Sequence, residues 1–132
     1  MPSSPEPPTW VDKSLRAGSV VLALAIVGLS LGPAPEEPTF QISDKVIHGL
    51  AYFSLTLAVL LAWVGRPGRL AQSFQVAVAA TLVVVSGGLL VELAQSLVSR
   101  QIEVLDALAN ALGAGLAFAV WSLVIRASPE QN

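Results

Sequence analysis

The chain has 132 residues, of which 54% are hydrophobic and only 12% are charged, and its mean hydropathy is +0.70. Soluble domains carry about 25% charged residues, so this composition excludes a soluble domain and indicates one compact membrane domain. Cysteine is absent, which excludes disulfides and thiolate metal sites. The net charge is −2, and the sequence has no basic run of the kind that binds nucleic acid.

The N-terminal part divides into a polar tail and an apolar segment. Residues 1–12 are rich in Pro and Ser and cannot bury enough apolar area to offset ordering, so we expect a flexible tail. Residues 13–31 predict a first membrane helix, close to the shortest length that spans a bilayer core of about 30 Å. The alternative is a cleaved secretory signal peptide, with Lys13 and Arg16 as its charged beginning.

The rest of the chain predicts three further helices. A loop rich in Pro and Glu precedes the second helix, for which Ser43 or Asp44 is the expected N-cap. Gly and Pro residues break the chain again before the third helix. We expect an all-α, polytopic membrane protein, a compact bundle of about four transmembrane helices within 13–126. The predicted later helices are 44–64, 70–98 and 103–125, followed by a C-terminal tail, 127–132.

Small residues recur every four positions in the last predicted helix. Stripes of this kind let helix backbones approach closely in lipid. We expect them to serve packing within the bundle, with homodimerisation as the alternative, so the oligomeric state stays open. The two stripes are Ala107, Ala111, Gly115 and Ala119, and Ala109, Gly113 and Ala117.

The distribution of Lys and Arg predicts the orientation. With four helices, both termini and the loop between the second and third helices share one side of the membrane. That side carries most of the cations, so the positive-inside rule places both termini in the cytoplasm. Its cations are Lys13, Arg16, Arg66, Arg69 and Arg126, against Lys45 and Arg100 on the outer side.

Polar residues recur at helical spacing near the outer end of three predicted helices. Residues three or four apart share one face of a helix, and at about 1.5 Å per residue all these positions lie within roughly 10 Å of the outer interface. The sequence therefore predicts one polar site built from three helices. Its members are Asp44, His48 and Tyr52 in the second helix, Glu92 and Gln95 in the third, and Asp106 and Asn110 in the fourth.

Three of these residues are candidates for catalysis: His48, Glu92 and Asp106. An imidazole suits proton transfer near neutral pH, and a carboxylate inside a membrane helix is costly unless it is paired or functional. The structural alternative makes Glu92 the partner of Lys45, Arg100 or His48, and makes Asp106 a favourable charge at a helix N-terminus. Gln95 and Asn110 would then be hydrogen-bonding contacts between helices.

The remaining polar residues are candidates for binding a substrate. Lys45 and Arg100 are expected to hold an anionic group. One His is too few for a zinc site and no loop signature indicates a hard cation, so we expect neither a metal nor a cofactor. Trp63 and Trp121 are expected to lie at the membrane interface. The full set of candidate binding residues is Asp44, Lys45, Tyr52, Gln95, Arg100 and Asn110.

Taken together, these motifs resemble the VanZ-like family of small bacterial integral membrane proteins. The resemblance covers roughly residues 40–120 and consists of D-K-x-x-H-x-x-x-Y at 44–52, E-x-x-Q at 92–95, Arg100, and D-x-x-x-N-x-x-G at 106–113. It implies a multi-pass protein of the bacterial plasma membrane. The founding member is associated with low-level resistance to teicoplanin, and the family's biochemical mechanism is not established.

Three functions are open from the sequence. The first is an outward-facing pocket that binds or modifies a membrane lipid or a lipid-linked envelope precursor, whether or not a reaction is catalysed. The second is a non-catalytic scaffold or interaction module whose polar residues lock the bundle. The third is a small transporter, which would place polar residues deeper in the membrane.

Overall fold

A computed structural model describes residues 9–33, 41–66, 73–98 and 102–128. Each of its four helices is long and apolar enough to cross a membrane. The prediction of an all-α, multi-pass membrane protein is confirmed. The helices are α1 (Thr9–Leu31), α2 (Gln41–Val59), α3 (Phe74–Leu97) and α4 (Val104–Ala127), and a π-helical turn, η1 (Leu60–Val64), continues α2.

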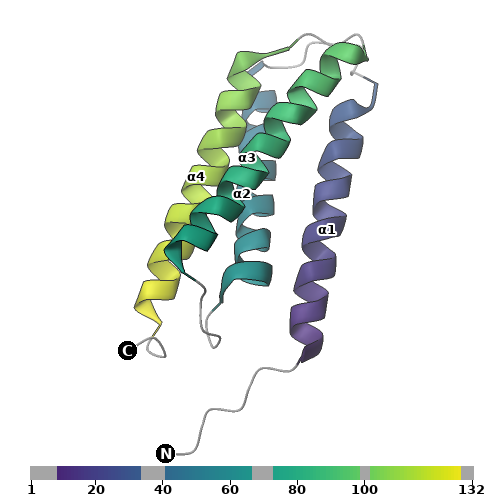
Figure 1. Ribbon diagram of the computed structural model, residues 1–132. Coiled ribbons are helices and arrows are strands. Elements are labelled where there is room, and N and C mark those ends of the chain that lie inside the picture. The colour runs from purple at the N-terminus through teal and green to yellow at the C-terminus, as the bar shows by residue number, and fades with distance from the viewer. Residues whose placement is uncertain (1–8, 34–40, 67–72, 99–101, 129–132) are drawn as a thin grey trace, which may run out of the picture.

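The helices lie side by side, with the start of α1 and the end of α4 at the same end of the bundle (Figure 1). α2 packs most extensively against α4, and α3 covers that pair. α1 stands at the edge, where Ser19 is its only buried residue. The apolar side chains that α1 exposes, such as Leu24 and Leu29, suit contact with lipid, because a membrane helix need not bury them against protein.

Helix boundaries differ from prediction at three places. α1 begins at Thr9, so the predicted tail 1–12 is too long, because the prolines that prevent helix end at Pro8. α2 begins at Gln41, which places Ser43 and Asp44 inside the helix and not at its N-cap. α3 begins at Phe74, later than the predicted 70, and residues 70–72 lie outside the described part.

The fourth helix follows its prediction closely. α4 begins at Val104 and ends at Ala127, one residue and two residues from the predicted ends, within the usual ambiguity of helix boundaries. Its buried positions are spaced three and four residues apart, except for the adjacent pair Gly113 and Ala114. They form one face that turns toward α2 and α3, and they are Asp106, Asn110, Gly113, Ala114, Ala117, Trp121 and Ile125.

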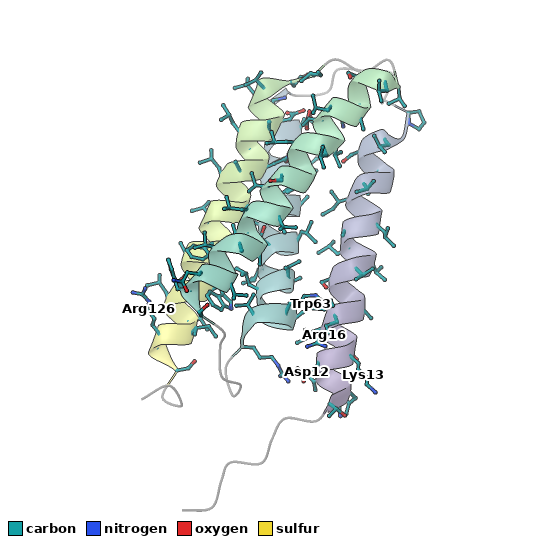
Figure 2. The ribbon with its side chains drawn as sticks, viewed as in Figure 1. Asp12, Lys13, Arg16, Trp63 and Arg126 are labelled. Atoms are coloured by element: carbon teal, nitrogen blue, oxygen red, sulfur yellow. The ribbon has the colours of Figure 1, made fainter. Side chains whose placement is uncertain are left out.

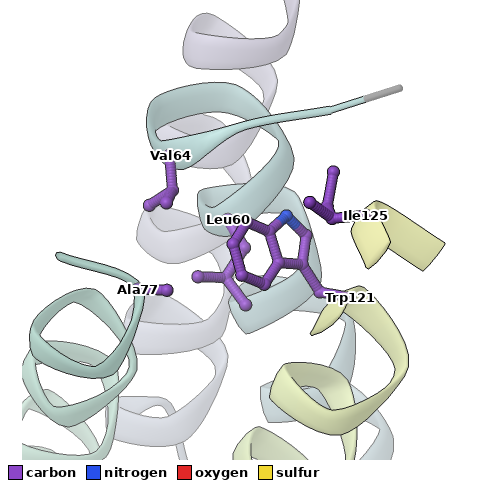
Figure 3. Packing of buried hydrophobic residues seen from close by; sticks show 5 residues of the cluster. All are labelled: Leu60, Val64, Ala77, Trp121 and Ile125. Atoms are coloured by element: carbon purple, nitrogen blue, oxygen red, sulfur yellow. The ribbon is translucent and has the colours of Figure 1, made fainter. Parts of the chain in front are cut away.

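An apolar cluster closes the end of the bundle that carries the termini. Leu60 and Val64 of η1 pack there with Ala77, Trp121 and Ile125 (Figure 3). The Trp121 indole nitrogen donates a 2.7 Å hydrogen bond to the carbonyl oxygen of Gly65. The expectation that Trp121 anchors at the membrane interface is wrong, because its ring is 4% exposed and fills this core.

Trp63, by contrast, is 47% exposed and joins α1 to the end of α2. Its indole nitrogen donates to Ser19 Oγ at 3.1 Å, and the Arg16 guanidinium lies 4.8 Å from the ring centroid, a cation–π contact. A 3.1 Å ion pair between Arg66 and Asp12 lies at the same end. Figure 2 shows Asp12, Arg16 and Trp63 gathered there, so polar contacts hold the otherwise loosely packed α1.

At the opposite end, the backbones of α2 and α4 touch. A Cβ atom at Gly113 would overlap the carbonyl oxygen of Gly49, while Gly49 itself faces the carbonyl of Ala109. Gly115, on the other small-residue stripe, has open space around it. The stripe through Gly113 therefore packs inside the bundle, as expected, and it brings the N-terminal turns of α2 and α4 close together.

Candidate functional site

The candidate site is built on the first turns of α2 and α4. Asp44, Lys45 and His48 lie in the first two turns of α2, and Asp106 and Asn110 occupy the buried face of α4. Since Gly49 and Gly113 hold the two helices in backbone contact one residue beyond His48, these side chains meet directly. We refer to these five residues as the polar layer.

Lys45 is the cation of the polar layer and it is already paired. Its ammonium forms ion pairs with Asp106 of α4 and with Glu103, which immediately precedes that helix. It also lies 3.9 Å from the Asp44 carboxylate. Lys45 therefore ties α2 to α4, and its charge is neutralised by the protein itself and not left for an anionic ligand.

His48 is oriented by an amide and faces two carboxylates. Its Nδ1 lies 3.1 Å from Asn110 Oδ1, and because an amide oxygen only accepts, Nδ1 carries the proton and donates it. In the neutral ring, Nε2 then carries a lone pair. That atom lies 3.8 Å from Asp44 Oδ1 and 3.8 Å from Asp106 Oδ2, too far for hydrogen bonds.

Glu92 enters from α3 and is the least satisfied group of the site. It is 3% exposed, and neither of its carboxylate oxygens has a hydrogen-bond partner among the residues described. The carboxylate that acts on it most strongly is that of Asp106, which repels a negative charge on Glu92. A buried carboxylate without a partner is costly, so Glu92 is poorly explained as a packing residue.

Tyr52 and Gln95 have other surroundings. The ring of Tyr52 packs on Gly88 of α3, where an added Cβ would lie 2.8 Å from Tyr52 Cε1, and Tyr52 is buried against Leu55 and Val84. The amide nitrogen of Gln95 donates a 2.9 Å hydrogen bond to the carbonyl oxygen of Ser30. Gln95 thus joins α3 to the end of α1 and turns away from the polar layer.

The structure brings together most, but not all, of the predicted site residues. Arg100 lies outside the described residues. Asp106 is in the first turn of α4 but forms ion pairs across to α2. Two contributors were not predicted: Glu103, which pairs with Lys45, and Gly49, on which α4 rests. The spacing of Glu103 three residues before Asp106 was the available signal for the first.

The electrostatic balance of this end of the bundle is negative. Among the described residues, this end carries four carboxylates, and Lys45 is the one ammonium that pairs with any of them. The four carboxylates are those of Asp44, Glu92, Glu103 and Asp106. Two of the four, those of Asp44 and Glu103, have side chains about half exposed. The arrangement can therefore attract a cationic group at its exposed edge and stabilise it further in, beside Glu92.

Comparison of the chain with protein-family models, with curated proteins and with solved structures finds no match. The function is therefore inferred from the geometry and charge of the site itself.

Proposed function

We propose that this chain is a VanZ-like protein of the bacterial plasma membrane, whose polar layer binds, and with His48 and Glu92 modifies, the polar head of a membrane lipid or lipid-linked envelope precursor. The observation that carries the proposal is the buried, unpartnered carboxylate of Glu92 beside the polar layer. A group of this kind is rarely retained in a membrane helix without a ligand or a reaction to serve.

The location of the polar layer supports a head group as the ligand. Four residues of the site lie within two turns of the start of α2, the end of α3 or the start of α4, which is a depth of roughly 10 Å at 1.5 Å per residue. They are His48, Glu92, Asp106 and Asn110. This is the depth of head groups and the first carbons of the acyl chains. An amphiphile could bring its head to this site and leave its chains in the bilayer.

The distribution of cations supports an outward-facing position for this end of the bundle. In Figure 2, Lys13, Arg16 and Arg126 lie at the end of the bundle where α1 begins and α4 ends, whereas the polar layer lies where α2 and α4 begin. The positive-inside rule puts the end that carries these cations in the cytoplasm. The polar layer then faces the outer leaflet, where lipid-linked envelope precursors are used.

The charges of the site favour a head group that carries an amine. Lys45 is paired with Asp106 and Glu103, so the expectation that it holds an anion gains no support. An amine would meet Asp44 at the exposed edge and Glu92 within. His48, fixed by Asn110, is placed to accept or donate a proton there.

Two other functions have less support. A scaffold function, in which polar residues only hold the helices together, explains the contacts of Lys45 and Gln95. It does not explain Glu92, whose carboxylate has no hydrogen-bond partner among the described residues. A transporter would place ionisable residues deeper in the membrane. Away from this end, the buried polar residues that the structure describes are Ser19 and Thr56, and neither is ionisable.

The experiment compares lipid preference in matched variants. The purified chain is placed in nanodiscs that contain equal amounts of phosphatidylethanolamine and phosphatidylglycerol, and the lipids retained after ejection into the gas phase are counted by native mass spectrometry. The wild type should retain the amine-bearing lipid in excess, and Glu92→Gln should remove that preference. Asp12→Asn makes the same chemical change at the other end of the bundle, where Asp12 pairs with Arg66, and should keep the preference.

Either of two results would contradict the proposal. The first is a wild type that retains both lipids equally. The second is a Glu92→Gln variant that is folded and keeps the wild-type preference, which would assign Glu92 to the bundle alone.

A further inference from the structure

We propose that Asp44, His48 and Asp106 form a binding site for one divalent transition-metal ion. The inference uses the polar layer but does not depend on the ligand being a lipid. Each residue offers one ligand atom, and the three atoms all lie within 4.8 Å of one another. Two carboxylate oxygens and one imidazole nitrogen suit Mn²⁺ or Zn²⁺.

The distances between these three ligand atoms are too long for hydrogen bonds but suit the binding of one shared ion. Two atoms that bind one ion at about 2.1 Å lie at most about 4.2 Å apart. The two separations from His48 Nε2, both 3.8 Å, already meet this limit. The separation between the carboxylate oxygens of Asp44 and Asp106 needs at most a small closure, which the half-exposed side chain of Asp44 can supply by rotation.

The orientation of His48 is that of a metal ligand. A ligating His usually donates its other ring N–H to an oxygen atom, which fixes the tautomer and directs the free lone pair at the metal. Asn110 Oδ1 does this for Nδ1. The lone pair of Nε2 then faces two carboxylate oxygens, three groups that repel one another unless a cation lies among them.

Lys45 does not occupy the same place. Its ammonium pairs with Oδ1 of Asp106, whereas the oxygen nearest His48 Nε2 is Oδ2. The ammonium and a metal ion can therefore bind opposite oxygens of one carboxylate. A single ammonium leaves most of the negative charge of this end of the bundle unbalanced among the described residues.

Glu92 gives independent evidence that a cation belongs here. It comes from a different helix, is 3% exposed, and has no hydrogen-bond partner within the described part of the chain. Among the described residues, the carboxylate that acts most strongly on it is that of Asp106, one of the three proposed ligands. A divalent ion between those ligands would provide the positive charge that this carboxylate lacks.

The test measures metal binding by the full chain in detergent without added lipid. The protein is stripped with chelator and titrated with Mn²⁺ or Zn²⁺, and bound metal is measured by elemental analysis and by the loss of the free Mn²⁺ resonance. We expect one ion per chain. Asp44→Asn should weaken binding at least tenfold. Asp12→Asn, the same loss of charge at the other end of the bundle, where Asp12 pairs with Arg66, should weaken it less than threefold.

A spectroscopic measurement identifies the nitrogen ligand without relying on weakened binding. Pulsed electron resonance of the Mn²⁺-loaded wild type should show coupling to a directly bound imidazole nitrogen, which His48→Gln should abolish. The proposal is overturned if the folded wild type binds neither ion stoichiometrically, if no nitrogen coupling is seen, or if Asp12→Asn weakens binding as much as Asp44→Asn. Because no lipid is present, none of these outcomes bears on the preference for a head group.

Discussion

At the scale of single residues, the contrast between Glu92 and Gln95 is informative. They lie three residues apart on the buried face of α3, yet only the amide has a partner, the carbonyl of Ser30. An amide inside the bundle is cheap because it both donates and accepts, whereas a carboxylate can only accept. Both residues were predicted to belong to the site. In the structure, Gln95 binds the backbone of Ser30, whereas Glu92 has no hydrogen-bond partner among the described residues.

This contrast predicts that Glu92→Gln and Gln95→Glu change the stability of the protein in opposite directions. Glu92→Gln should raise the free energy of unfolding by about 1 kcal/mol or more, since a carboxylate without a partner becomes a neutral amide. Gln95→Glu should lower it by a similar amount, because the donor to Ser30 is lost. Thermal unfolding in detergent measures both, and a destabilised Glu92→Gln would mean that the carboxylate has a partner in the folded protein.

At the scale of helices, the pairing of α2 with α4 determines the site. The polar layer exists because the two helices cross at Gly49 and Gly113 with no side chain between them. Spacing in the sequence showed which residues share a face of each helix. It did not show which helix that face meets, because apolar surface surrounds each helix and lipid can cover any of it.

The crossing can be tested with two glycines of the same helix. Gly113→Ala should destabilise the protein by about 1–3 kcal/mol, because the added Cβ overlaps the backbone of Gly49 and the helices must separate. Gly115→Ala, where nothing lies within 4 Å, should have no effect or stabilise α4. Unfolding midpoints of the two variants decide the matter, and equal midpoints would show that α4 does not rest on α2 at Gly113.

Much of the fold followed from the sequence for physical reasons that can be named. Long apolar runs predicted all four helices, since a membrane span needs about 20 such residues. The start of α1 was predicted at residue 13 and lies at Thr9, because only the prolines of the polar tail prevent helix formation and the last of them is Pro8. His48, Asp106 and Asn110 were found by spacing, but the burial of Trp121 in a core was not, because an aromatic near a helix end usually marks the interface.

At the scale of the whole molecule, the two ends of the bundle differ in chemistry. One end is closed by the apolar cluster around Leu60 and Trp121 (Figure 3) and is surrounded by Lys and Arg. The other end holds buried carboxylates, His48 and Lys45. We expect a protein with such different ends to insert in one direction, so that the polar layer serves a single leaflet.

The orientation predicts the outcome of reporter fusions. Reporters fused after Glu37 and after Arg100 should be active outside the cell, and a reporter fused after Pro67 should be active in the cytoplasm. The reason is the excess of Lys and Arg on the side of the termini. Alkaline phosphatase and green fluorescent protein serve as complementary reporters, and a Pro67 fusion active outside would invert the topology and move the polar layer to the cytoplasmic leaflet.

The backbone contact between Gly49 and Gly113 has a consequence for how the protein responds to its bilayer. Touching backbones cannot be compressed, and the contact lies immediately beside His48. A thinner or thicker bilayer changes the tilt of helices that are free to move. Here α1 packs loosely, with Ser19 its only buried residue, and it is joined to the end of α2 by the contacts of Trp63 and Arg66, far from the crossing of α2 with α4. The distance between His48 on α2 and Asp106 on α4 should therefore stay constant across membranes of different thickness, even where the tilt of α1 changes.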